Sequence, residues 1–145
     1  MANHDQTNAL LEKTSEFNLL YKRITEQLLA KINLSSSAIN LIKLLGDQEL
    51  TLTEVTKSSR LDKSTVSRQM NALVKKEYVA KTTGKDKRFA YFTLTDNARE
   101  VYDSYQADLE EQFNTILSGW TEEEIHMLTV LIGRLNRSVT NRLGS

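Results

Sequence analysis

Hydrophobic residues recur along most of the chain at spacings typical of helices. Between residues 10 and 33 they fall mostly three, four or seven positions apart, which predicts one apolar face on a long helix. The stretch 35–45 is apolar on most sides and ends at Gly46, a residue suited to a left-handed cap, so we expect a central helix there. Further amphipathic stretches follow Thr95 and Thr121. Because the chain has no proline and only five glycines, long helices are expected throughout.

Four helix starts share one local signal. A polar N-cap is preceded by a hydrophobic residue and followed, four positions after the cap, by another that can pack against it. The four N-caps are Ser35, Thr51, Asp62 and Thr121. At two of them a glutamate three residues later completes a capping box, namely Glu54 and Glu124. These signals predict a short helix near 52–60, a three-residue turn and a second helix over 63–77.

Between Tyr78 and Leu94 the pattern changes from helical to extended. Two segments rich in β-branched and aromatic residues, YVAKT and FAYFTL, flank the polar turn TGKDKR, which predicts a β-hairpin. The expected order is four helices, the hairpin and two more helices. A short helix, a tight turn, a second helix and an immediate hairpin are typical of a winged helix-turn-helix. The predicted fold is therefore mostly α with a small β-hairpin wing, flanked by N-terminal and C-terminal helices.

Charge is distributed unevenly along the chain, although 19 basic and 19 acidic residues give a total of zero. Residues 57–91 hold ten basic and three acidic residues, a net charge of +7, whereas 1–56 carry −2 and 92–145 carry −5. The positive excess coincides with the predicted helix-turn-helix and hairpin. A charged run alone is usually a solvated helix face. Cations gathered on one compact module instead favour binding to the phosphate backbone of nucleic acid.

Composition limits the chemistry that the chain can perform. It has no cysteine and two histidines, which excludes disulfides, thiolate metal sites and a cysteine nucleophile, and makes a multi-histidine zinc site unexpected. We interpret His4 as part of a polar N-terminal tail and His126 as a surface or interface residue. Without a glycine-rich phosphate loop or paired-carboxylate motif, we expect neither an enzyme nor a cofactor. No secretory pattern or apolar run of about 18 residues occurs, so we expect a soluble, cytoplasmic protein.

The second helix of the predicted motif has one apolar and one polar face. The apolar face is formed by Val66, Met70, Leu73 and Val74. The polar face is formed by Ser64, Thr65, Ser67, Arg68 and Asn71. Short hydroxyl side chains permit a close approach to DNA, and the planar guanidinium of an arginine can bind a guanine edge or a phosphate. An ordinary surface helix is the alternative, and the adjacent basic hairpin favours DNA binding over it.

The segment LDKSTVSRQMNALVKKEYVAK, followed by GKDKRFAYFTLTDNA, resembles the recognition helix and wing of the MarR family of bacterial transcription regulators. The pattern of that family runs from an S-T-V-T/S-R helix into a D-x-R wing that ends L-T-x-x-G. The resemblance is specific over 61–95 and covers the whole chain in architecture. Glu77 and Ala98 stand where the family commonly has glycine. Thr56 and Arg60 replace a small residue and a glycine often found in the first helix of the motif.

The resemblance implies which residues contact DNA and an effector. Arg88 would reach toward the minor groove, and Asp86 would stabilise the tip of the wing. The expected DNA-binding residues are Lys63, Ser64, Thr65, Ser67, Arg68, Asn71, Lys75, Lys85, Lys87 and Arg88. The expected effector is a small hydrophobic or phenolic molecule bound between the dimer helices and the winged domain. Its expected lining residues are Phe17, Tyr21, Ile24 and Ile39.

The resemblance and the apolar faces of the outer helices imply a homodimer. We divide the chain into an N-terminal dimerisation helix (1–34), a winged helix-turn-helix DNA-binding domain (35–95) and C-terminal dimerisation helices (96–145). The expected function is sequence-specific binding of double-stranded DNA by a transcriptional regulator, a ligand-responsive repressor on a pseudo-palindromic operator. Two alternatives stay open. The outer helices could instead close into an intramolecular bundle, and the winged helix could serve only as a protein-interaction module.

Overall fold

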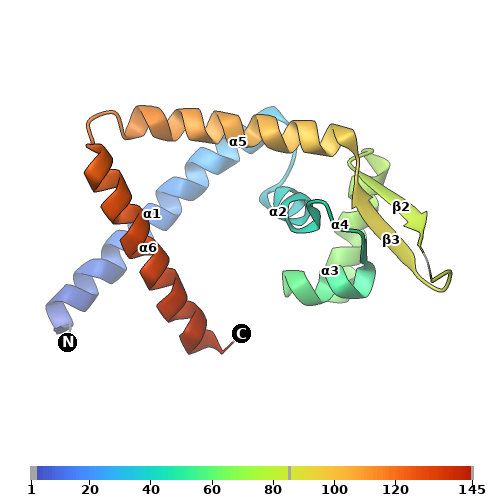
Figure 1. Ribbon diagram of the computed structural model, residues 1–145, viewed down its shortest axis with the longest axis horizontal. Helices are drawn as coiled ribbons and strands as arrows, with labels where there is room; N and C mark the ends of the chain where they lie inside the picture. The colour runs from blue at the N-terminus through green and yellow to red at the C-terminus, as the bar shows by residue number, and fades with distance from the viewer. Residues whose placement is uncertain (1–2, 85, 145) are drawn as a thin grey trace. The chain divides into compact units, whose positions relative to one another are not determined.

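The computed structural model describes residues 3–84 and 86–144 (Figure 1). The helices within these residues are α1 His4–Lys31, α2 Ser36–Leu45, α3 Leu52–Ser59, α4 Lys63–Lys75, α5 Asp96–Ile116 and α6 Glu122–Leu143. The strands are β1 Leu50–Thr51, β2 Val79–Thr83 and β3 Ala90–Leu94. The predicted fold class, mostly α with a small β wing, is confirmed, as is the order of the helices and the hairpin.

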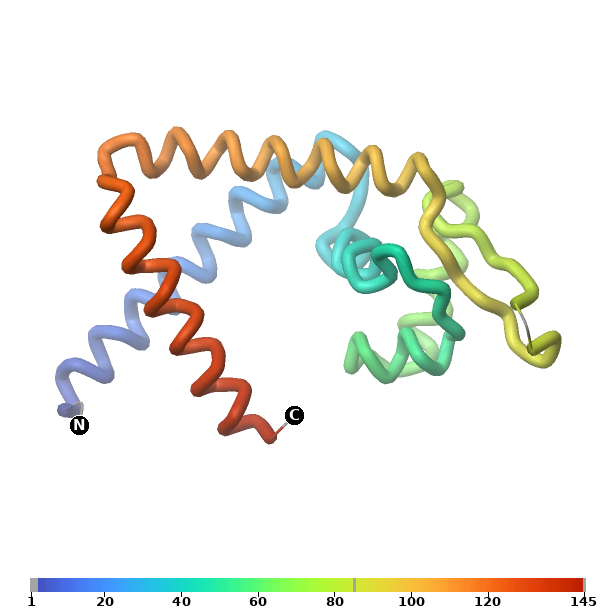
Figure 2. Tube along the Cα trace, in the orientation of Figure 1, coloured from blue at the N-terminus to red at the C-terminus, as the bar shows by residue number. Residues whose placement is uncertain are grey.

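The chain divides into two compact units, residues 1–109 and 110–145. The first unit contains α1 to α4, the sheet and most of α5, and the second contains the end of α5 and all of α6. Within the first unit, the path through α2, α3, α4 and the hairpin runs from cyan to yellow in Figure 2. The three-part division expected from the sequence, with boundaries after residues 34 and 95, stays a prediction.

All four predicted N-caps begin helices. Each accepts a hydrogen bond on its side chain from the backbone N–H three residues later, at Ser35, Thr51, Asp62 and Thr121. Both predicted capping boxes are complete, with Glu54 and with Glu124. Thr95 acts similarly before α5, where its Oγ1 accepts from the backbone N–H of Ala98 at 3.2 Å. Such caps satisfy N–H groups that the first helical turn leaves without partners, so they fix where each helix starts.

Two helix boundaries and the conformation of one cap differ from the sequence prediction. α1 begins at His4 with Asn3 as its N-cap, so the assignment of His4 to a polar tail is wrong. The missed signal is the cap itself, which also forms a capping box. Gly46 ends α2 with φ 50° and ψ −125°, a positive φ that lies outside the left-handed helical region. α4 ends at Lys75 rather than at residue 77, and Glu77 leaves the helix with φ 64°.

The sheet contains a strand that the sequence did not predict. Its order is β1-β3-β2, and both neighbouring pairs are antiparallel. β1 pairs Leu50 with Phe92, and β2 pairs Val79 with Leu94. Because α3 follows β1 directly, this pairing ties the start of the helix-turn-helix to the wing. Two residues are too few to show an alternating pattern, which is why β1 escaped prediction.

The hydrophobic core lies in the first unit, mostly in its winged part, which runs from α2 to β3, and Leu28 and Leu29 of α1 and Ala98 and Tyr105 of α5 also belong to it. The predicted central helix α2 contributes Ile39, Leu41, Ile42 and Leu45, all buried. From α4, the buried residues are Val66, Met70 and Leu73, with Val74 half-buried, which confirms the predicted apolar face. The sheet and α3 add Leu50, Val55, Val79, Phe92 and Leu94. Burying each large apolar side chain contributes roughly 1.5–3 kcal/mol, so this packing fixes α4 against the wing.

Two non-glycine residues of the winged part have a left-handed backbone. Arg60 follows α3 with φ 60°, and Glu77 follows α4 with φ 64°. Both stand at positions where the family that the sequence resembles has glycine, the residue that adopts positive φ without a steric cost. Ala98, at a third such position, is fully buried, so the core accommodates its methyl group.

Two kinds of feature are missing from the part of the chain that the structure describes. No single helix there is both long and apolar enough to cross a bilayer, and α1 and α2 have the required length and composition only as a pair bent by 84°. The same residues contain no group of three or more His, Asp or Glu side chains placed to hold a metal ion.

Candidate nucleic-acid interface

The polar face of α4 is open to solvent. Its exposed side chains are Lys63, Ser64, Arg68, Asn71 and Lys75, while those of Thr65 and Ser67 are half-buried. The side chain of Arg68 forms no hydrogen bond or ion pair with any other described residue. Its guanidinium therefore keeps all five N–H donors available for an external acceptor such as a guanine edge or a phosphate.

The start of α4 carries a closed hydrogen-bond network around Asp62. Oδ1 of Asp62 accepts from the backbone N–H of Thr65 at 2.8 Å and from Ser64 Oγ at 2.6 Å. Oδ2 accepts from Thr65 Oγ1 at 2.8 Å. These hydrogen bonds, led by that of Ser64, hold the pKa of Asp62 well below its usual range. The two hydroxyls expected to approach DNA are thus already donors to a carboxylate of the protein.

The wing tip is organised by Asp86 and Arg88. The Arg88 guanidinium donates to Asp86 through Nη2 at 2.7 Å and through Nε at 3.0 Å, and the backbone N–H of Arg88 donates at 3.1 Å. The pairing lowers the pKa of Asp86 and raises that of Arg88. The Arg88 side chain is still 81% exposed, and its guanidinium lies 5.5 Å from the ring centre of Phe89. Lys87 is exposed, and Lys85 lies outside the described residues.

The strands that carry the wing pack through aromatic residues. A Cβ at Gly84 would collide with the ring of Tyr91, so the backbone passes close to the ring only because residue 84 is glycine. Lys81 on β2 is paired with Phe92 on β3, and the Lys81 ammonium lies 5.9 Å from the centre of the Phe92 ring. Phe92 is buried in the core, so the wing strands are fixed to the same core as α4.

Most cations of the segment 57–91 have no acidic partner. Within the described residues of this segment, Arg88 alone forms an ion pair. The net charge of +7 that the sequence places here is therefore largely uncompensated at short range. Uncompensated cations on one module attract a polyanion, and the attraction weakens with added salt.

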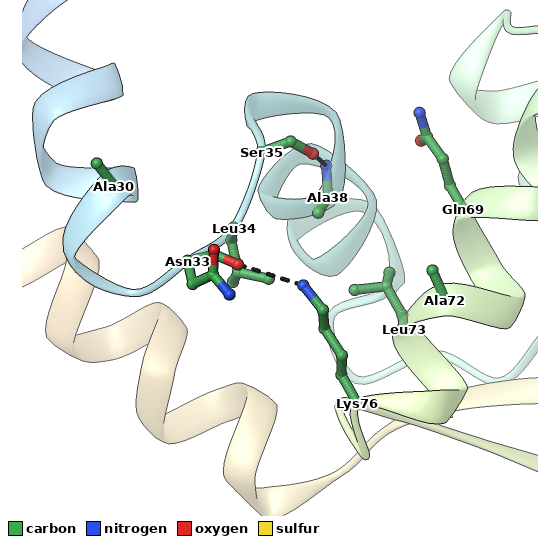
Figure 3. Close-up of a pocket in the computed structure, with 9 residues that line it drawn as sticks. All are labelled: Ala30, Asn33, Leu34, Ser35, Ala38, Gln69, Ala72, Leu73 and Lys76. Carbon is green, nitrogen blue, oxygen red and sulfur yellow. Dashed lines mark hydrogen bonds between the residues drawn. The ribbon is translucent and has the colours of Figure 1, made fainter.

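A cavity of about 430 Å³ lies between the end of α1, the start of α2 and the second half of α4 (Figure 3). Lys76 Nζ donates across it to the carbonyl of Asn33 at 3.3 Å. Gln69 also lines the cavity, and its buried Oε1 has no hydrogen-bond partner among the described residues. The hydrogen bond of Lys76 joins the end of α4 to the connection between α1 and α2, so these elements are linked by more than the hydrophobic core.

A second cavity, of about 240 Å³, is lined by two of the four residues expected to hold an effector, Tyr21 and Ile39, and not by Phe17 or Ile24. The assignment of these residues to an effector stays a prediction. Phe17 is half-exposed with its ring 5.8 Å from that of Tyr21, and Ile24 packs against the core. Helical periodicity placed all four on apolar faces but could not say which would face a cavity.

Other residues of this second cavity were missed in the sequence. They include Lys22, Lys43, Tyr102 and Tyr105, and none of the lining side chains is a carboxylate. Burial raises the pKa of Tyr105, so its hydroxyl is neutral at ordinary pH. The two tyrosines come from α5, far along the chain from α1 and α2, so no local pattern could have assigned them to the same site.

Comparison with known sequences finds transcription regulators. Residues 38–83 match the family model described as the IclR helix-turn-helix domain. The chain is 31% identical over 86 residues to the uncharacterized HTH-type transcriptional regulator YxaD of Bacillus subtilis, a match covering 59% of this chain and 60% of YxaD. It is 25% identical over 101 residues to the transcriptional regulator AdcR of Streptococcus pyogenes, covering 67% and 69%. These relatives are named as regulators of transcription, not as enzymes.

Comparison with solved structures finds the same architecture over nearly the whole chain. A MarR family protein from Bacillus stearothermophilus superposes with a TM-score of 0.83 at 18% identity, covering 96% of this chain and 99% of that one. Staphylococcus aureus MarR in complex with salicylate and kanamycin gives 0.82 at 16% identity, covering 95% of each. A mutant of S. aureus MepR bound to an oligodeoxyribonucleotide gives 0.67 at 18%, covering 91% and 97%. The chain therefore has the winged helix-turn-helix fold of MarR family proteins.

Proposed function

We propose that this protein is a transcriptional regulator that binds double-stranded DNA sequence-specifically, as a homodimer on a pseudo-palindromic operator. The observation that carries the proposal is the coincidence of the solvent-open polar face of α4 with a module in which most of the described cations lack acidic partners. The similarity to named transcription regulators supports it. So does the likeness in fold to the MepR mutant that was solved with an oligodeoxyribonucleotide.

In this proposal α4 and the wing have different tasks. α4 enters the major groove, where the unpaired guanidinium of Arg68 reads a base edge while Asn71 and Ser67 add polar contacts. The lysines, namely Lys63, Lys75, Lys85 and Lys87, bind phosphates. Arg88 lies over the minor groove, where Asp86 holds its guanidinium in one orientation. A narrow A·T-rich groove concentrates negative potential, which favours an arginine there.

The dimer would bury apolar surface that the described core leaves exposed. On α6 the exposed large hydrophobic residues are Met127, Leu128, Val130, Leu131, Ile132, Leu135, Val139 and Leu143. On α1 they include Leu10, Leu11, Leu19 and Leu20. Soluble monomers rarely expose apolar patches of this extent, and a two-fold dimer is the commonest way to cover them.

The regulator would act as a ligand-responsive repressor through the second cavity. With two lysines, three tyrosines and no carboxylate in its lining, the cavity suits a small phenolic molecule that carries a negative charge. S. aureus MarR, which shares the fold, was solved in complex with salicylate. To weaken DNA binding, such a ligand must bind more tightly to a form of the dimer in which the two recognition helices do not match the operator.

The test combines selection and titration. Random duplexes are selected on the full chain, and the enriched sequence is compared with a scrambled one by fluorescence anisotropy at several salt concentrations. We expect an inverted repeat bound about 10³-fold or more tightly than scrambled DNA. Lys75→Gln should weaken binding to both DNAs. The matched control Arg134→Gln, which removes a charge from α6, should leave both affinities unchanged. A protein-interaction module would enrich no sequence.

The effector assignment has its own measurement. Sodium salicylate serves as the probe, and its effect on operator affinity is compared between the wild type, Lys43→Gln and the control Lys31→Gln, which lies outside the cavity. We expect the response to fall in Lys43→Gln and in Tyr21→Ala only. An unchanged response in Tyr21→Ala would place the effector elsewhere.

A further inference from the structure

Phe89 is an aromatic residue that the core of the winged part does not use. It is 48% exposed, whereas Phe92, three residues further along the chain, is buried. Among the described residues of the hairpin, 78–84 and 86–94, no other large hydrophobic residue is exposed. A single exposed hydrophobic residue is common on protein surfaces and needs no explanation by itself. At Phe89 the neighbouring residues supply one.

The backbone and Arg88 position the Phe89 ring at the tip of the wing. The backbone N–H of Phe89 donates to the carbonyl of Asp86 at 3.2 Å, which closes a tight turn just before β3. The Arg88 guanidinium lies 5.5 Å from the centre of the ring and is itself held by the carboxylate of Asp86. Arg88 and Phe89, here called the wing-tip pair, therefore present a cation beside an exposed apolar ring. A side chain that is already positioned loses less conformational entropy on binding.

We propose that the Phe89 ring inserts between neighbouring base pairs from the minor groove and partly unstacks one base step. The inference rests on the proposed DNA-binding function, in which Arg88 lies over the minor groove. A ring 5.5 Å from that guanidinium reaches the same groove. Proteins that bind in the minor groove frequently use phenylalanine as an apolar wedge in this way. Stacking against a base removes the exposed ring from water, which offsets the cost of unstacking the bases.

Arg88 alone and the wing-tip pair favour different DNA sequences. Arg88 by itself favours an A-tract, whose minor groove is narrow and strongly negative but whose base pairs are stiff. A wedge favours a step that unstacks easily, and TpA is the flexible step that A·T base pairs can form. We therefore expect the wing-tip pair to select a TpA step over an A-tract of the same base composition. This preference rejects the sequence that an arginine alone would choose.

The first test compares operator flanks of equal base composition. The operator obtained by selection on the full chain is synthesised with TATA or with AATT where hydroxyl-radical footprinting shows protection of the minor groove. The wild type should bind the TATA operator about tenfold more tightly, because the cost of deforming DNA depends on its sequence. Phe89→Ala should lose or reverse this preference, since Arg88 then acts alone. Fluorescence anisotropy gives the affinities, and thermal unfolding followed by circular dichroism checks that Phe89→Ala is folded.

The second test observes the unstacking itself. 2-Aminopurine replaces the adenine of the TpA step, and its fluorescence rises when neighbouring bases no longer stack on it. Saturating wild type should raise the fluorescence, and saturating Phe89→Ala should not. Phe89→Leu should keep most of the rise, because leucine is also an apolar wedge although it has no ring for the guanidinium of Arg88. The matched control Phe17→Ala removes a ring on α1 that is 51% exposed, and should keep all of it.

The outcomes separate this inference from the proposed function. If the wild type selects an operator but prefers the AATT flanks, or raises the fluorescence at no step, the ring does not unstack DNA and the inference is wrong, while the proposed function stands. If Phe89→Ala or Phe17→Ala changes the fluorescence in the same way as the other, the signal does not come from the ring of Phe89. If Phe89→Leu loses the rise, the ring only positions Arg88, and the inference is again wrong. If the wild type selects no sequence at all, the proposed function fails and this inference fails with it.

Discussion

The winged part of the chain and helix α6 use hydrophobic residues in opposite ways. All buried hydrophobic residues among the described ones lie between Leu28 and Tyr105. α6 is 22 residues long and amphipathic, but it has no buried residue. Eight of its large hydrophobic side chains are exposed. The winged part, together with the adjoining residues of α1 and α5, thus buries its apolar surface within the first unit, whereas the described residues of α6 bury none.

This difference separates two sources of stability. Roughly 25 cal/mol is gained for each Å² of apolar surface removed from water, so an unburied stripe gains nothing until another surface covers it. α6 does have strong local signals, including the capping box of Thr121 and Glu124. Local signals define the helix, whereas the described core does not cover its apolar face.

The largest effect is expected from removing α6. A chain truncated after Ser118 should keep a folded winged part, because that part contains the core. It should lose the dimer, and operator affinity should fall to the non-specific level, about 10³-fold or more. Sedimentation gives the oligomeric state and anisotropy gives the affinity. A well-folded dimer from the truncated chain would contradict the proposal that α6 forms the dimer interface. In the full chain, Ile132→Asp should also break the dimer, whereas the polar control Asn136→Asp should not.

A matched pair of methionines compares the two regions directly. Met70 is fully buried on α4, and Met127 is 62% exposed on α6. Met70→Ala should lower the free energy of unfolding by about 2–5 kcal/mol, because it leaves a cavity in a packed core. Met127→Ala truncates a side chain that the described core leaves exposed and that only the proposed dimer would cover, so the expected loss is smaller, about 1 kcal/mol. Urea denaturation at a fixed protein concentration measures both, and equal losses would show that α6 is buried in solution as fully as α4.

Sequence reasoning succeeded where structure is decided locally. The caps Ser35 and Thr51 and the inward face of α4 depend on residues within a turn or two, so pattern was sufficient. It failed for β1, whose two residues pair with a strand about 40 positions away. For the same reason no sequence pattern could place Tyr102 beside Tyr21, because Tyr102 reaches the second cavity only through tertiary packing.

Arg68 tests the proposal that the winged part carries sequence recognition. Because its guanidinium has no partner among the described residues, Arg68→Ala removes no intramolecular contact and should leave stability nearly unchanged. Operator binding should weaken by roughly 1–3 kcal/mol, with relaxed discrimination at one base position in each half-site. Titration against operator and scrambled DNA separates the roles. Equal losses on both DNAs would reassign Arg68 to phosphate.

Arg88 should behave differently, because Asp86 already holds it and the minor groove offers a degenerate code. Arg88→Ala should weaken binding to many sequences, most where the flanks are A·T-rich. It should also reduce the slope of log affinity against log salt by about one unit for each phosphate that the arginine neutralises. Anisotropy with operators that differ only in their flanks, at several salt concentrations, gives both quantities. A loss confined to one base position would instead place Arg88 in direct base readout.

The smallest effect tests how firmly the packed region holds its own backbone. Glu77 has φ 64°, yet its exposed side chain forms no hydrogen bond, while its backbone N–H donates to Val74 at 3.0 Å and its carbonyl accepts from Thr95 Oγ1 at 2.7 Å. Tertiary contacts therefore hold a residue in a conformation that glycine adopts without a steric cost. Glu77→Gly relieves that cost but adds flexibility to the unfolded chain, so we expect a net stabilisation of about 0.5–1 kcal/mol. Asn33, also at positive φ, is the matched control, because asparagine tolerates the left-handed region and Asn33→Gly should stabilise less. Urea unfolding of both variants measures the difference. If Glu77→Gly destabilises the protein, the strain relieved at residue 77 is smaller than the free-energy cost of the greater conformational entropy that glycine gives the unfolded chain.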